Sequence, residues 1–407
     1  METKIFKKMK SNPPVITTLF KKLQTKVGCR MHFRFMVCVA AATVMAGRGY
    51  TATLSENVAS GSPLLVQETK PSAFMLPDET ETPRMKTWID YHYGMFIHFS
   101  MNTFVGTQQV PNPPPATTYA PPPSLDVDAW VKLAKDAGMK YAVLTARHSA
   151  GFCLWDSKVT WHGKEFDYDV AASSNQTDVV QAFMDACKKY GIAPGFYYCL
   201  IEGYANTSVP FKEQWSKGLM PEDAFELAKA QLAELATKYP DCHYFWIDIP
   251  TTATVDQQAT LYTVLRRTNP GNIVLMNSHF AANAKTGDED LLERKANSLY
   301  PSDILNTESK RVPEGVVSYI QRWKGKTLFL GYEHCATAGQ GWFNSGAPKP
   351  VDELFDLYQM IRHDGGNLLL DIGPPSNGVI PPTYRETLLQ LKNNIDAYEK
   401  SATTTPK

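Results

Sequence analysis

Residues 127–147 read VDAWVKLAKDAGMKYAVLTAR, in which a helical pattern passes directly into an apolar run. Apolar residues recur at helical spacing over Val127–Gly138, whereas Tyr141–Arg147 is apolar almost throughout. Strands that read as near-continuous apolar runs and alternate with helices indicate a parallel sheet buried on both faces. This segment therefore predicts an α/β fold.

The same alternation continues on both sides of this segment. No Gly-x-Gly-x-x-Gly motif follows a strand, and polar residues gather at the carboxyl ends of nearly all strands, so we expect a (β/α)8 TIM-like barrel rather than an open doubly wound sheet. The further strands that we expect are Tyr93–Ser100, Pro194–Leu200, Tyr244–Pro250, Asn272–Asn277, Thr327–Glu333 and Asn367–Gly373, with an eighth near Leu299–Leu305. The clearest further helices are Gln176–Tyr190, Pro221–Tyr239 and Pro350–Arg362.

The amino-terminal segment has the features of a targeting sequence. Residues 1–50 hold ten Lys or Arg and one acid, Glu2. Basic residues up to Arg34 precede an uncharged apolar run from Phe35 to Ala46, and small residues follow near Ala52, as in a secretory signal. The run is about a dozen residues long, shorter than the roughly 20 that a membrane span needs. We therefore expect a secreted or lumenal protein without stable insertion in a membrane.

The charge of the remaining chain excludes one class of partner. Removing residues 1–50 from the totals of 41 basic and 41 acidic residues leaves 31 and 40, a net charge of −9. Binding to nucleic acid needs clustered Lys and Arg, so we exclude nucleic acid as a partner.

We expect the chain to divide into four segments: 1–52 as a signal peptide or basic targeting segment, 53–82 as a linker, 83–400 as one catalytic domain and 401–407 as a tail. Five of the seven Cys residues lie beyond the targeting segment, and no Cys-x-x-Cys pair suggests zinc or redox chemistry. Asn175-Gln-Thr and Asn206-Thr-Ser are acceptor motifs for N-glycosylation and fit a secretory route.

Polar side chains at the expected strand ends predict the chemistry. In a (β/α)8 barrel these ends converge on one face. Without a Gly-rich phosphate loop, such a pocket suggests hydrolysis of a neutral polar substrate, and glycoside hydrolysis needs two carboxyl groups. Asp248 is the expected nucleophile, and Glu308 in a loop is the expected second carboxyl group, ahead of Glu333 and Glu293. The strand ends carry His98, Arg147-His148, Tyr197-Tyr198, Trp246-Ile-Asp248, Glu333-His334 and Asp371.

Several ordered motifs resemble the family-29 glycoside hydrolases, the α-L-fucosidases. The resemblance covers about residues 85–395, nearly all of the expected folded chain. The motifs are Tyr93-Gly-Met-Phe-Ile-His98-Phe-Ser, the run from Leu125 to Arg147-His148, Tyr190-Gly-Ile-Ala-Pro-Gly-Phe-Tyr-Tyr198, and Gly365-Gly-Asn-Leu-Leu-Leu-Asp-Ile-Gly-Pro374.

The resemblance implies hydrolysis of terminal α-L-fucose with retention of configuration, through a covalent fucosyl-Asp248 intermediate. It implies no metal and no cofactor, and its substrate is a fucosylated oligosaccharide or glycoconjugate. The position of the proton donor varies in this family, and we expect Glu308 in that role. The expected substrate-binding residues are His98, His148, Tyr198, Trp246, Glu333 and Trp342.

The sequence also departs from the family pattern. Ser149 stands where a second His is usual, Gln108-Gln109 replaces Glu-Trp, Asp371 replaces Asn, and Ile249-Pro250 replaces a Gly-containing turn. The chain ends at Lys407, so we expect the catalytic barrel alone, without the C-terminal β-sandwich of many relatives.

Two alternatives remain open from the sequence. One is a barrel that binds sugar with weak or no hydrolase activity. The other is a metal-dependent barrel hydrolase with His98, His148 and Asp248 as ligands. Sensitivity to EDTA would indicate the metal enzyme, and sugar binding without turnover would indicate the binding protein.

Overall fold

The computed structural model describes residues 74–404 except 206–208, 215–218, 278–284, 286, 295–300 and 309–317. The expected targeting segment, most of the expected linker and the Asn206 acceptor motif lie outside the described residues.

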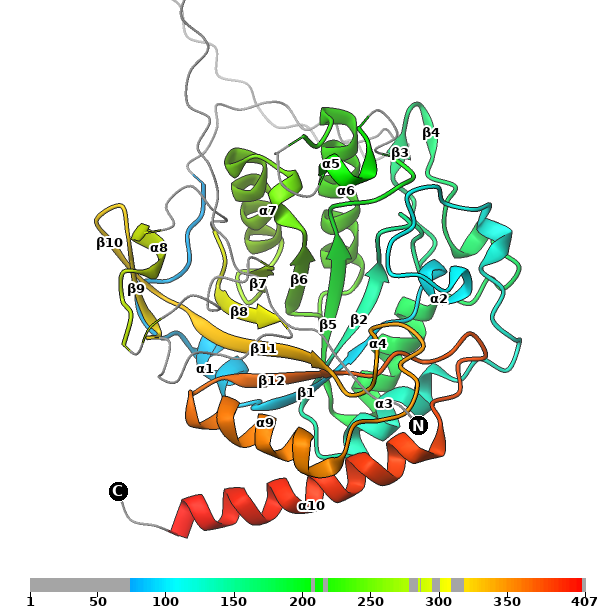
Figure 1. The fold of residues 1–407 in the computed structure, drawn as a ribbon. Helices are drawn as coiled ribbons and strands as arrows, with labels where there is room; N and C mark the ends of the chain where they lie inside the picture. Colours follow the sequence, from blue (N-terminus) through cyan, green and yellow to red (C-terminus); the bar gives the residue numbers. More distant parts are fainter. Residues whose placement is uncertain are drawn as a thin grey trace, which may run out of the picture. The chain divides into compact units, whose positions relative to one another are not determined.

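Eight parallel strands form a nearly closed barrel, which confirms the expected fold class (Figure 1). They follow the order β7-β6-β5-β2-β1-β12-β11-β8. The strands are β1 (Tyr93–Ile97), β2 (Tyr141–Arg147), β5 (Ala193–Cys199), β6 (Tyr244–Asp248), β7 (Ile273–Met276), β8 (Ile304–Glu308), β11 (Gly331–Thr337) and β12 (Asn367–Asp371).

Asp303 links β7 and β8, the first and last strands in this order. Its backbone N–H donates to the carbonyl oxygen of Val274 at 2.8 Å, and its Oδ2 accepts from the N–H of Val274 at 2.9 Å. Oδ1 of Asp303 also accepts from Arg84 and from the hydroxyl group of Tyr262, each at 2.8 Å. A buried carboxylate thus bridges β7 and the segment that leads into β8.

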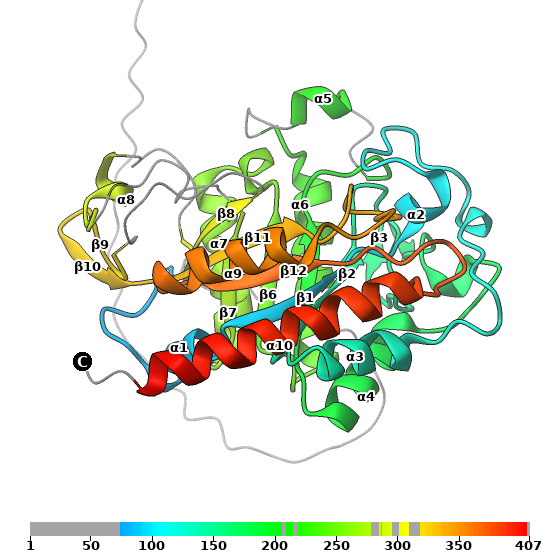
Figure 2. The ribbon, with the colours of Figure 1, turned by 60° about the horizontal axis from the view of Figure 1, so that its bottom comes forward.

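Helices surround the barrel, and α10 lies alongside α9 on its outer side (Figure 2). Side-chain caps help to fix where they begin: Asp126 Oδ1 accepts from the N–H of Ala129, and Asp178 Oδ1 from that of Gln181. The longer helices are α3 (Val127–Asp136), α4 (Val179–Tyr190), α6 (Glu222–Lys238), α7 (Val255–Thr268), α9 (Val351–His363) and α10 (Pro382–Thr404). The shorter ones are α1 (Pro83–Ile89), α2 (Met101–Val105), α5 (Phe211–Gln214) and α8 (Leu291–Arg294), with 3-10 turns at Ala116–Thr118, Val170–Ala172 and Pro250–Thr252.

The prediction of one strand over Thr327–Glu333 was wrong. Its first part is β10 (Lys326–Phe329), which forms an antiparallel hairpin with β9 (Ile320–Trp323). The barrel strand is β11, which begins only at Gly331 and runs to Thr337. The strand expected near Leu299–Leu305 corresponds to β8, which begins at Ile304 and ends at Glu308. Another hairpin joins β3 (Thr160–Trp161) and β4 (Lys164–Glu165).

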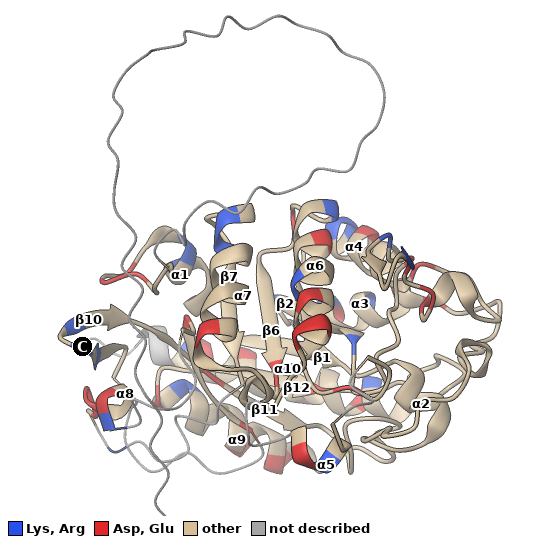
Figure 3. Ribbon diagram, turned by 90° about the horizontal axis from the view of Figure 1, so that it is seen from above, with Lys and Arg blue, Asp and Glu red and all other residues tan. Residues whose placement is uncertain are grey.

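Charged residues are common on the outer helices and rare in the barrel strands. In Figure 3, Lys and Arg mix with Asp and Glu on outer helices such as α6 and α7, whereas the barrel strands are nearly free of charge. The only Asp, Glu, Lys or Arg residues in the eight barrel strands are Arg147, Asp248, Glu308, Glu333 and Asp371. A charged group inside a barrel costs free energy unless it is paired, so these five residues are the first candidates for functional roles.

Within the described part of the chain, no helix has both the length and the apolar character needed to cross a membrane.

Candidate active site

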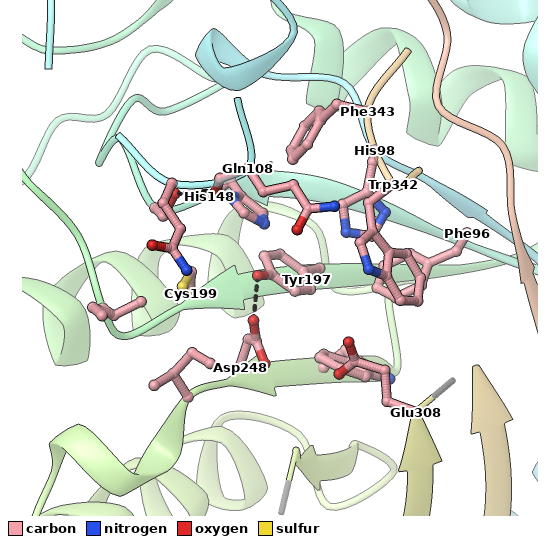
Figure 4. A pocket seen from close by; sticks show the side chains of 15 residues that line it. Phe96, His98, Gln108, His148, Tyr197, Cys199, Asp248, Glu308, Trp342 and Phe343 are labelled. Atoms are coloured by element: carbon pink, nitrogen blue, oxygen red, sulfur yellow. Dashed lines mark hydrogen bonds between the residues drawn. The ribbon is translucent and has the colours of Figure 1, made fainter. Parts of the chain in front are cut away.

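A pocket of about 150 Å³ lies at the carboxyl ends of the barrel strands (Figure 4). This is the face on which (β/α)8 barrels carry their active sites. The lining residues are Phe96, His98, Gln108, Gln109, His148, Ser149, Tyr197, Cys199, Ile201, Trp246, Asp248, Ile249, Glu308, Trp342 and Phe343.

The pocket brings Asp248 and Glu308 together. Asp248 ends β6 and Glu308 ends β8, and the side-chain amide nitrogen of Asn277 lies between them. This nitrogen donates to Oδ1 of Asp248 at 2.8 Å and to Oε2 of Glu308 at 3.0 Å. The sum of the two distances, 5.8 Å, is the upper limit for the separation of the two oxygens. Retaining glycosidases hold their carboxyl groups roughly 5 Å apart.

The two carboxyl groups have different surroundings. Asp248 accepts two hydrogen bonds, because the hydroxyl group of Tyr197 donates to its Oδ2 at 2.6 Å in addition to the bond from Asn277. These donors stabilise a carboxylate. Burial and the charge of Asp248 raise the pKa of Glu308 to about 7, although the bond from Asn277 lowers it. Such a pKa lets Glu308 hold or release a proton near neutral pH.

Aromatic rings form one wall of the pocket. The Tyr197 ring stacks on Trp246 at 5.4 Å and on His148 at 5.1 Å between ring centroids. The indole N–H of Trp246 donates to Oε1 of Glu333 at 2.9 Å, which fixes the plane of the indole. Flat apolar surfaces of this kind suit the apolar face of a sugar ring.

His98 and Trp342 also line the pocket. Nδ1 of His98 is 2.6 Å from Oδ1 of Asp371, and the His98 ring lies 5.1 Å from Trp342 and 5.7 Å from His148. Asp248, Glu308, His98, His148, Trp246 and Trp342, all expected from the sequence, therefore line one cavity.

Two expected substrate-binding residues, Tyr198 and Glu333, do not line the pocket. Tyr198 is buried, and its hydroxyl group donates to Gln231 of α6 at 2.8 Å, on the outer side of the barrel. Glu333 is the third residue of β11 and lies inside the barrel, away from the pocket. There it accepts hydrogen bonds from Tyr141, Tyr244 and Trp246. Glu308, expected in a loop, is the last residue of a strand.

Two residues of the pocket region had no expected role: Tyr197 was named only as a strand-end residue beside Tyr198, and Asn277 only as the end of an expected strand. Successive residues of a strand point to opposite faces, so Tyr197 shares a face with Cys199 while Tyr198 points outward. Asn277 directly follows β7, and the rule that polar strand ends build the site, applied to this strand, would have found it.

Four of the residues that depart from the family pattern line the pocket: Gln108, Gln109, Ser149 and Ile249. Asn102 donates from Nδ2 to Ser149 Oγ at 3.0 Å and to the carbonyl oxygen of Gln108 at 2.9 Å, which holds the loop with Gln108 and Gln109 at the pocket edge. Ile249, directly after Asp248, has a φ of 49°, a left-handed conformation that is strained for a β-branched residue and easy for glycine.

The metal-dependent alternative gains no support from the geometry. Within the described residues, no group of three or more His, Cys, Asp or Glu side chains is placed to hold a metal ion. Of the three ligands that this alternative names, His98 binds Asp371 and Asp248 binds Tyr197 and Asn277.

Comparison with known proteins identifies the family. The family model described as alpha-L-fucosidase matches residues 116–400, well over half of the chain. The chain belongs to the α-L-fucosidase family. The alpha-L-fucosidase 1 of Arabidopsis thaliana is 28% identical over 316 residues, which are 74% of this chain and 58% of that protein. The tissue alpha-L-fucosidase of Homo sapiens is 26% identical over 65% of this chain and 52% of its own length. This α-L-fucosidase family member thus spans about half the length of such relatives.

Solved structures of fucosidases share the fold. The alpha-L-fucosidase isoenzyme 1 of Paenibacillus thiaminolyticus has a TM-score of 0.59 and 22% identity, covering 78% of this chain and 76% of that one. A family-29 fucosidase of Bacteroides thetaiotaomicron, trapped as a covalent intermediate with 2-fluoro-fucosyl fluoride, has a TM-score of 0.60 and 22% identity, covering 79% and 76%. At this identity the likeness establishes the barrel fold of the family.

Proposed function

We propose that this protein is a retaining α-L-fucosidase, which hydrolyses terminal α-L-fucose from glycans with Asp248 as nucleophile and Glu308 as acid and base. The observation that carries the proposal is the amide of Asn277, which contacts both carboxyl groups and limits their separation to 5.8 Å, the sum of 2.8 and 3.0 Å. This separation suits a direct attack by one carboxylate and leaves too little room for a water molecule between carboxylate and sugar.

In the first step, a carboxylate oxygen of Asp248 attacks the anomeric carbon of fucose. The bond from that carbon to the glycosidic oxygen breaks, and the carboxylic acid of Glu308 gives its proton to the departing oxygen. The product is a fucosyl ester of Asp248. The trapped intermediate of the Bacteroides fucosidase supports a covalent route of this kind.

In the second step, the ionised Glu308 takes a proton from water, and the resulting hydroxyl attacks the anomeric carbon and releases Asp248. The electrostatics favour this change of role. The charge of Asp248 is one cause of the raised pKa of Glu308, and the ester carries no charge. The pKa of Glu308 therefore falls once the intermediate has formed, and Glu308 becomes the base that this step needs.

We assign sugar binding to the residues around the two carboxyl groups. Trp246 and Trp342 offer apolar surfaces, and His98 and His148 offer imidazole nitrogens for sugar hydroxyl groups. The substrates in this proposal are fucosylated oligosaccharides or glycoconjugates, as the names of the relatives suggest.

The decisive experiment measures release of 4-nitrophenol from its α-L-fucoside, with a β-galactoside as control, by the wild type and by Asp248→Ala. We expect fucoside-selective turnover that the substitution lowers by several orders of magnitude. Azide should restore turnover in Asp248→Ala and give fucosyl azide of inverted configuration. Unchanged activity in Asp248→Ala would exclude Asp248 as nucleophile. Binding of L-fucose without turnover by the wild type would favour the sugar-binding barrel, and inhibition by EDTA would favour the metal enzyme.

The proposal extends to the route of the protein in the cell. The basic and apolar pattern of residues 1–52 supports a secretory signal, followed by a linker over 53–82 and the catalytic domain over 83–400. Expression of the full chain in a eukaryotic host, with amino-terminal sequencing of the secreted protein, tests this assignment. A cleavage near Ala52 is expected, and retention of the intact chain inside the cell would contradict it. Mass spectrometry of the peptides with Asn175 and Asn206 would report glycosylation.

A further inference from the structure

Asp371 and His98 form a buried pair at the wall of the pocket. Asp371 ends β12, and His98 follows β1, its partner strand. Nδ1 of His98 lies 2.6 Å from Oδ1 of Asp371, and the two residues are 4% and 0% exposed. Oδ2 of Asp371 has no hydrogen-bond partner among the described residues. An ionised carboxylate in this position would leave a charged oxygen without a donor.

The number of protons on the pair decides what His98 offers to the pocket. Two arrangements have no net charge: a carboxylic acid that donates to Nδ1 of a neutral imidazole, and a carboxylate that faces an imidazolium. In both of them Nε2 carries a hydrogen. A third arrangement, a carboxylate that accepts from Nδ1–H of a neutral imidazole, leaves Nε2 as an acceptor and places a net negative charge in a buried site. Burial disfavours that charge.

The surroundings favour the arrangements without net charge. Burial raises the pKa of Asp371 well above its ordinary value, although a hydrogen bond from the backbone N–H of His98 lowers it. Burial lowers the pKa of His98 to about 3, although the charge of Asp248 raises it. Asp248, from β6, therefore helps the pair to keep its proton. The other titratable groups that face the pair are neutral, because burial lowers the pKa of the imidazole and raises the pKa of the phenols and the thiol; they are His148, Tyr197, Cys335 and Tyr384.

Neighbouring rings hold the imidazole plane. The His98 ring lies 4.4 Å from Phe96, 5.1 Å from Trp342 and 5.2 Å from Phe343, between ring centroids. With Nδ1 turned to Asp371, the opposite nitrogen, Nε2, has no hydrogen-bond partner among the described residues, and His98 lines the pocket. The rings fix the orientation of the imidazole, whereas Asp371 decides which nitrogen carries the hydrogen.

We propose that Asp371 is a positioning residue that acts through His98, sharing one proton with the imidazole so that Nε2–H donates a hydrogen bond to a hydroxyl group of the bound sugar. The inference rests on the proposed function, because it names the partner of His98 as a sugar hydroxyl. It predicts that the protein loses affinity for the sugar at alkaline pH, when the pair gives up its proton and Nε2 becomes an acceptor.

The first test compares Asp371→Asn with the wild type on the aryl α-L-fucoside. Asparagine has the same shape, but its amide can either donate to Nδ1 or accept from it and so does not fix the proton on Nε2. We expect KM to rise about tenfold, with kcat changed by less than about threefold, and the alkaline rise of KM to disappear. The matched control is Asp169→Asn, since Asp169 is also buried and has a pKa raised by burial to about 6, yet lies outside the pocket. Unchanged KM and pH dependence in Asp371→Asn would overturn the inference.

A double variant tests whether Asp371 acts through His98. If it does, His98→Gln combined with Asp371→Asn raises KM no further than His98→Gln alone. Additive effects of the two substitutions would assign Asp371 a separate role and overturn the proposal.

Nitrogen NMR of histidine-labelled protein separates this inference from the proposed function. The His98 signal is identified by its loss in His98→Gln, and we expect a hydrogen on Nε2 at pH 7 in the wild type. A neutral imidazole with its hydrogen on Nδ1 would overturn the inference, whether or not the protein hydrolyses fucosides. Absence of fucoside turnover together with a protonated Nε2 would instead count against the proposed function. The wild-type spectrum also decides the question if Asp371→Asn does not fold.

Discussion

The side-chain amide nitrogen of Asn277 lies 3.0 Å from Oε2 of Glu308, and it donates a second hydrogen bond to Asp248 at 2.8 Å. One amide therefore interacts with both proposed reacting groups. Its bond to Glu308 lowers the pKa of that group, whereas burial and the charge of Asp248 raise it to about 7. Asn277 thus limits how far the pKa of Glu308 rises.

Replacing Asn277 by Ala should move the pH profile to higher pH. Glu308 must be protonated for the first step, so activity is present below its pKa and is lost as the pH rises through about 7. Without the amide the pKa of Glu308 rises, and the alkaline limb of kcat/KM shifts upward. Loss of the bond to Asp248 should also lower kcat/KM by about ten- to a hundredfold. A limb that stays in place or moves to lower pH would contradict this role of Asn277.

Glu308→Gln should affect substrates according to their leaving groups. Natural glycans and alkyl fucosides need a proton on the departing oxygen, whereas activated aryl fucosides do not, so the loss of kcat/KM should be far larger for the former. The alkaline limb should also vanish from the profile measured with an activated aryl fucoside. Added azide should give fucosyl azide of retained configuration, the opposite of the product expected from Asp248→Ala. Equal losses on both substrate types would move the proton-donor role to another residue.

The barrel and the position of Asp248 could be predicted from the sequence because both depend on a strong local signal. Tyr141–Arg147 has the same bounds in the structure as in the prediction, and Asp248 ends the apolar run that forms β6. The end of a parallel strand is the same edge of the barrel for every strand, so strand ends alone gather the site residues without knowledge of the tertiary structure.

The side chains of Tyr197 and Tyr198 could not be assigned to a face from the sequence because both faces of a barrel strand are buried. In a strand with one solvated face, the alternation of polar and apolar residues shows which side chains point inward. The continuous apolar run around Tyr197 and Tyr198 has no such alternation. The error at Thr327–Glu333 has a different cause. The segment is apolar enough for one strand, but the chain divides it between β10, a partly exposed hairpin strand, and β11. The partners of Asn277, 29 residues from Asp248 and 31 from Glu308, depend on tertiary packing that no local pattern contains.

Matched substitutions of Tyr197 and Tyr198 test which side chain of β5 faces the pocket. Tyr197→Phe removes the 2.6 Å hydrogen bond to Asp248 and should lower kcat/KM about ten- to a hundredfold, with little change in stability. Tyr198→Phe removes the bond to Gln231 and should cost about 1 kcal/mol of the free energy of unfolding, with kcat/KM unchanged. Kinetics and urea unfolding of both variants measure the two effects. The opposite pattern would show that Tyr198 is the residue that faces the pocket.

Glu333 should make the stability depend on pH. Burial raises its pKa from the ordinary 4.5 to about 7, although three donors lower it, so the folded protein binds more protons than the unfolded chain between these values. The free energy of unfolding therefore falls as the pH rises through this window, by about 3 kcal/mol for the full shift. Glu333→Gln stays neutral and should lack this part of the decrease. Urea unfolding of both proteins at pH 5 and pH 8 isolates the contribution of Glu333, since all other groups are common to both, and equal decreases would contradict it.

The bridge at Asp303 should matter more for stability than the exposed ion pairs. Asp303 is fully buried and binds Arg84, Tyr262 and the N–H of Val274. In Asp303→Ala, Arg84 keeps its bonds to Asp78 and to the carbonyl oxygen of Asn272, but the hydroxyl group of Tyr262 and the N–H of Val274 lose their acceptor. The expected cost is about 2–4 kcal/mol of the free energy of unfolding, because two buried donors are left unsatisfied and the ion pair of Arg84 is weakened. Glu289→Ala is the control, because it removes an exposed ion pair with Arg322 and should cost less than about 1 kcal/mol. Asp303 lies outside the pocket, so kcat/KM per folded molecule should be preserved in Asp303→Ala. Similar costs for the two substitutions would mean that contacts other than the Asp303 bridge hold β7 and β8 together.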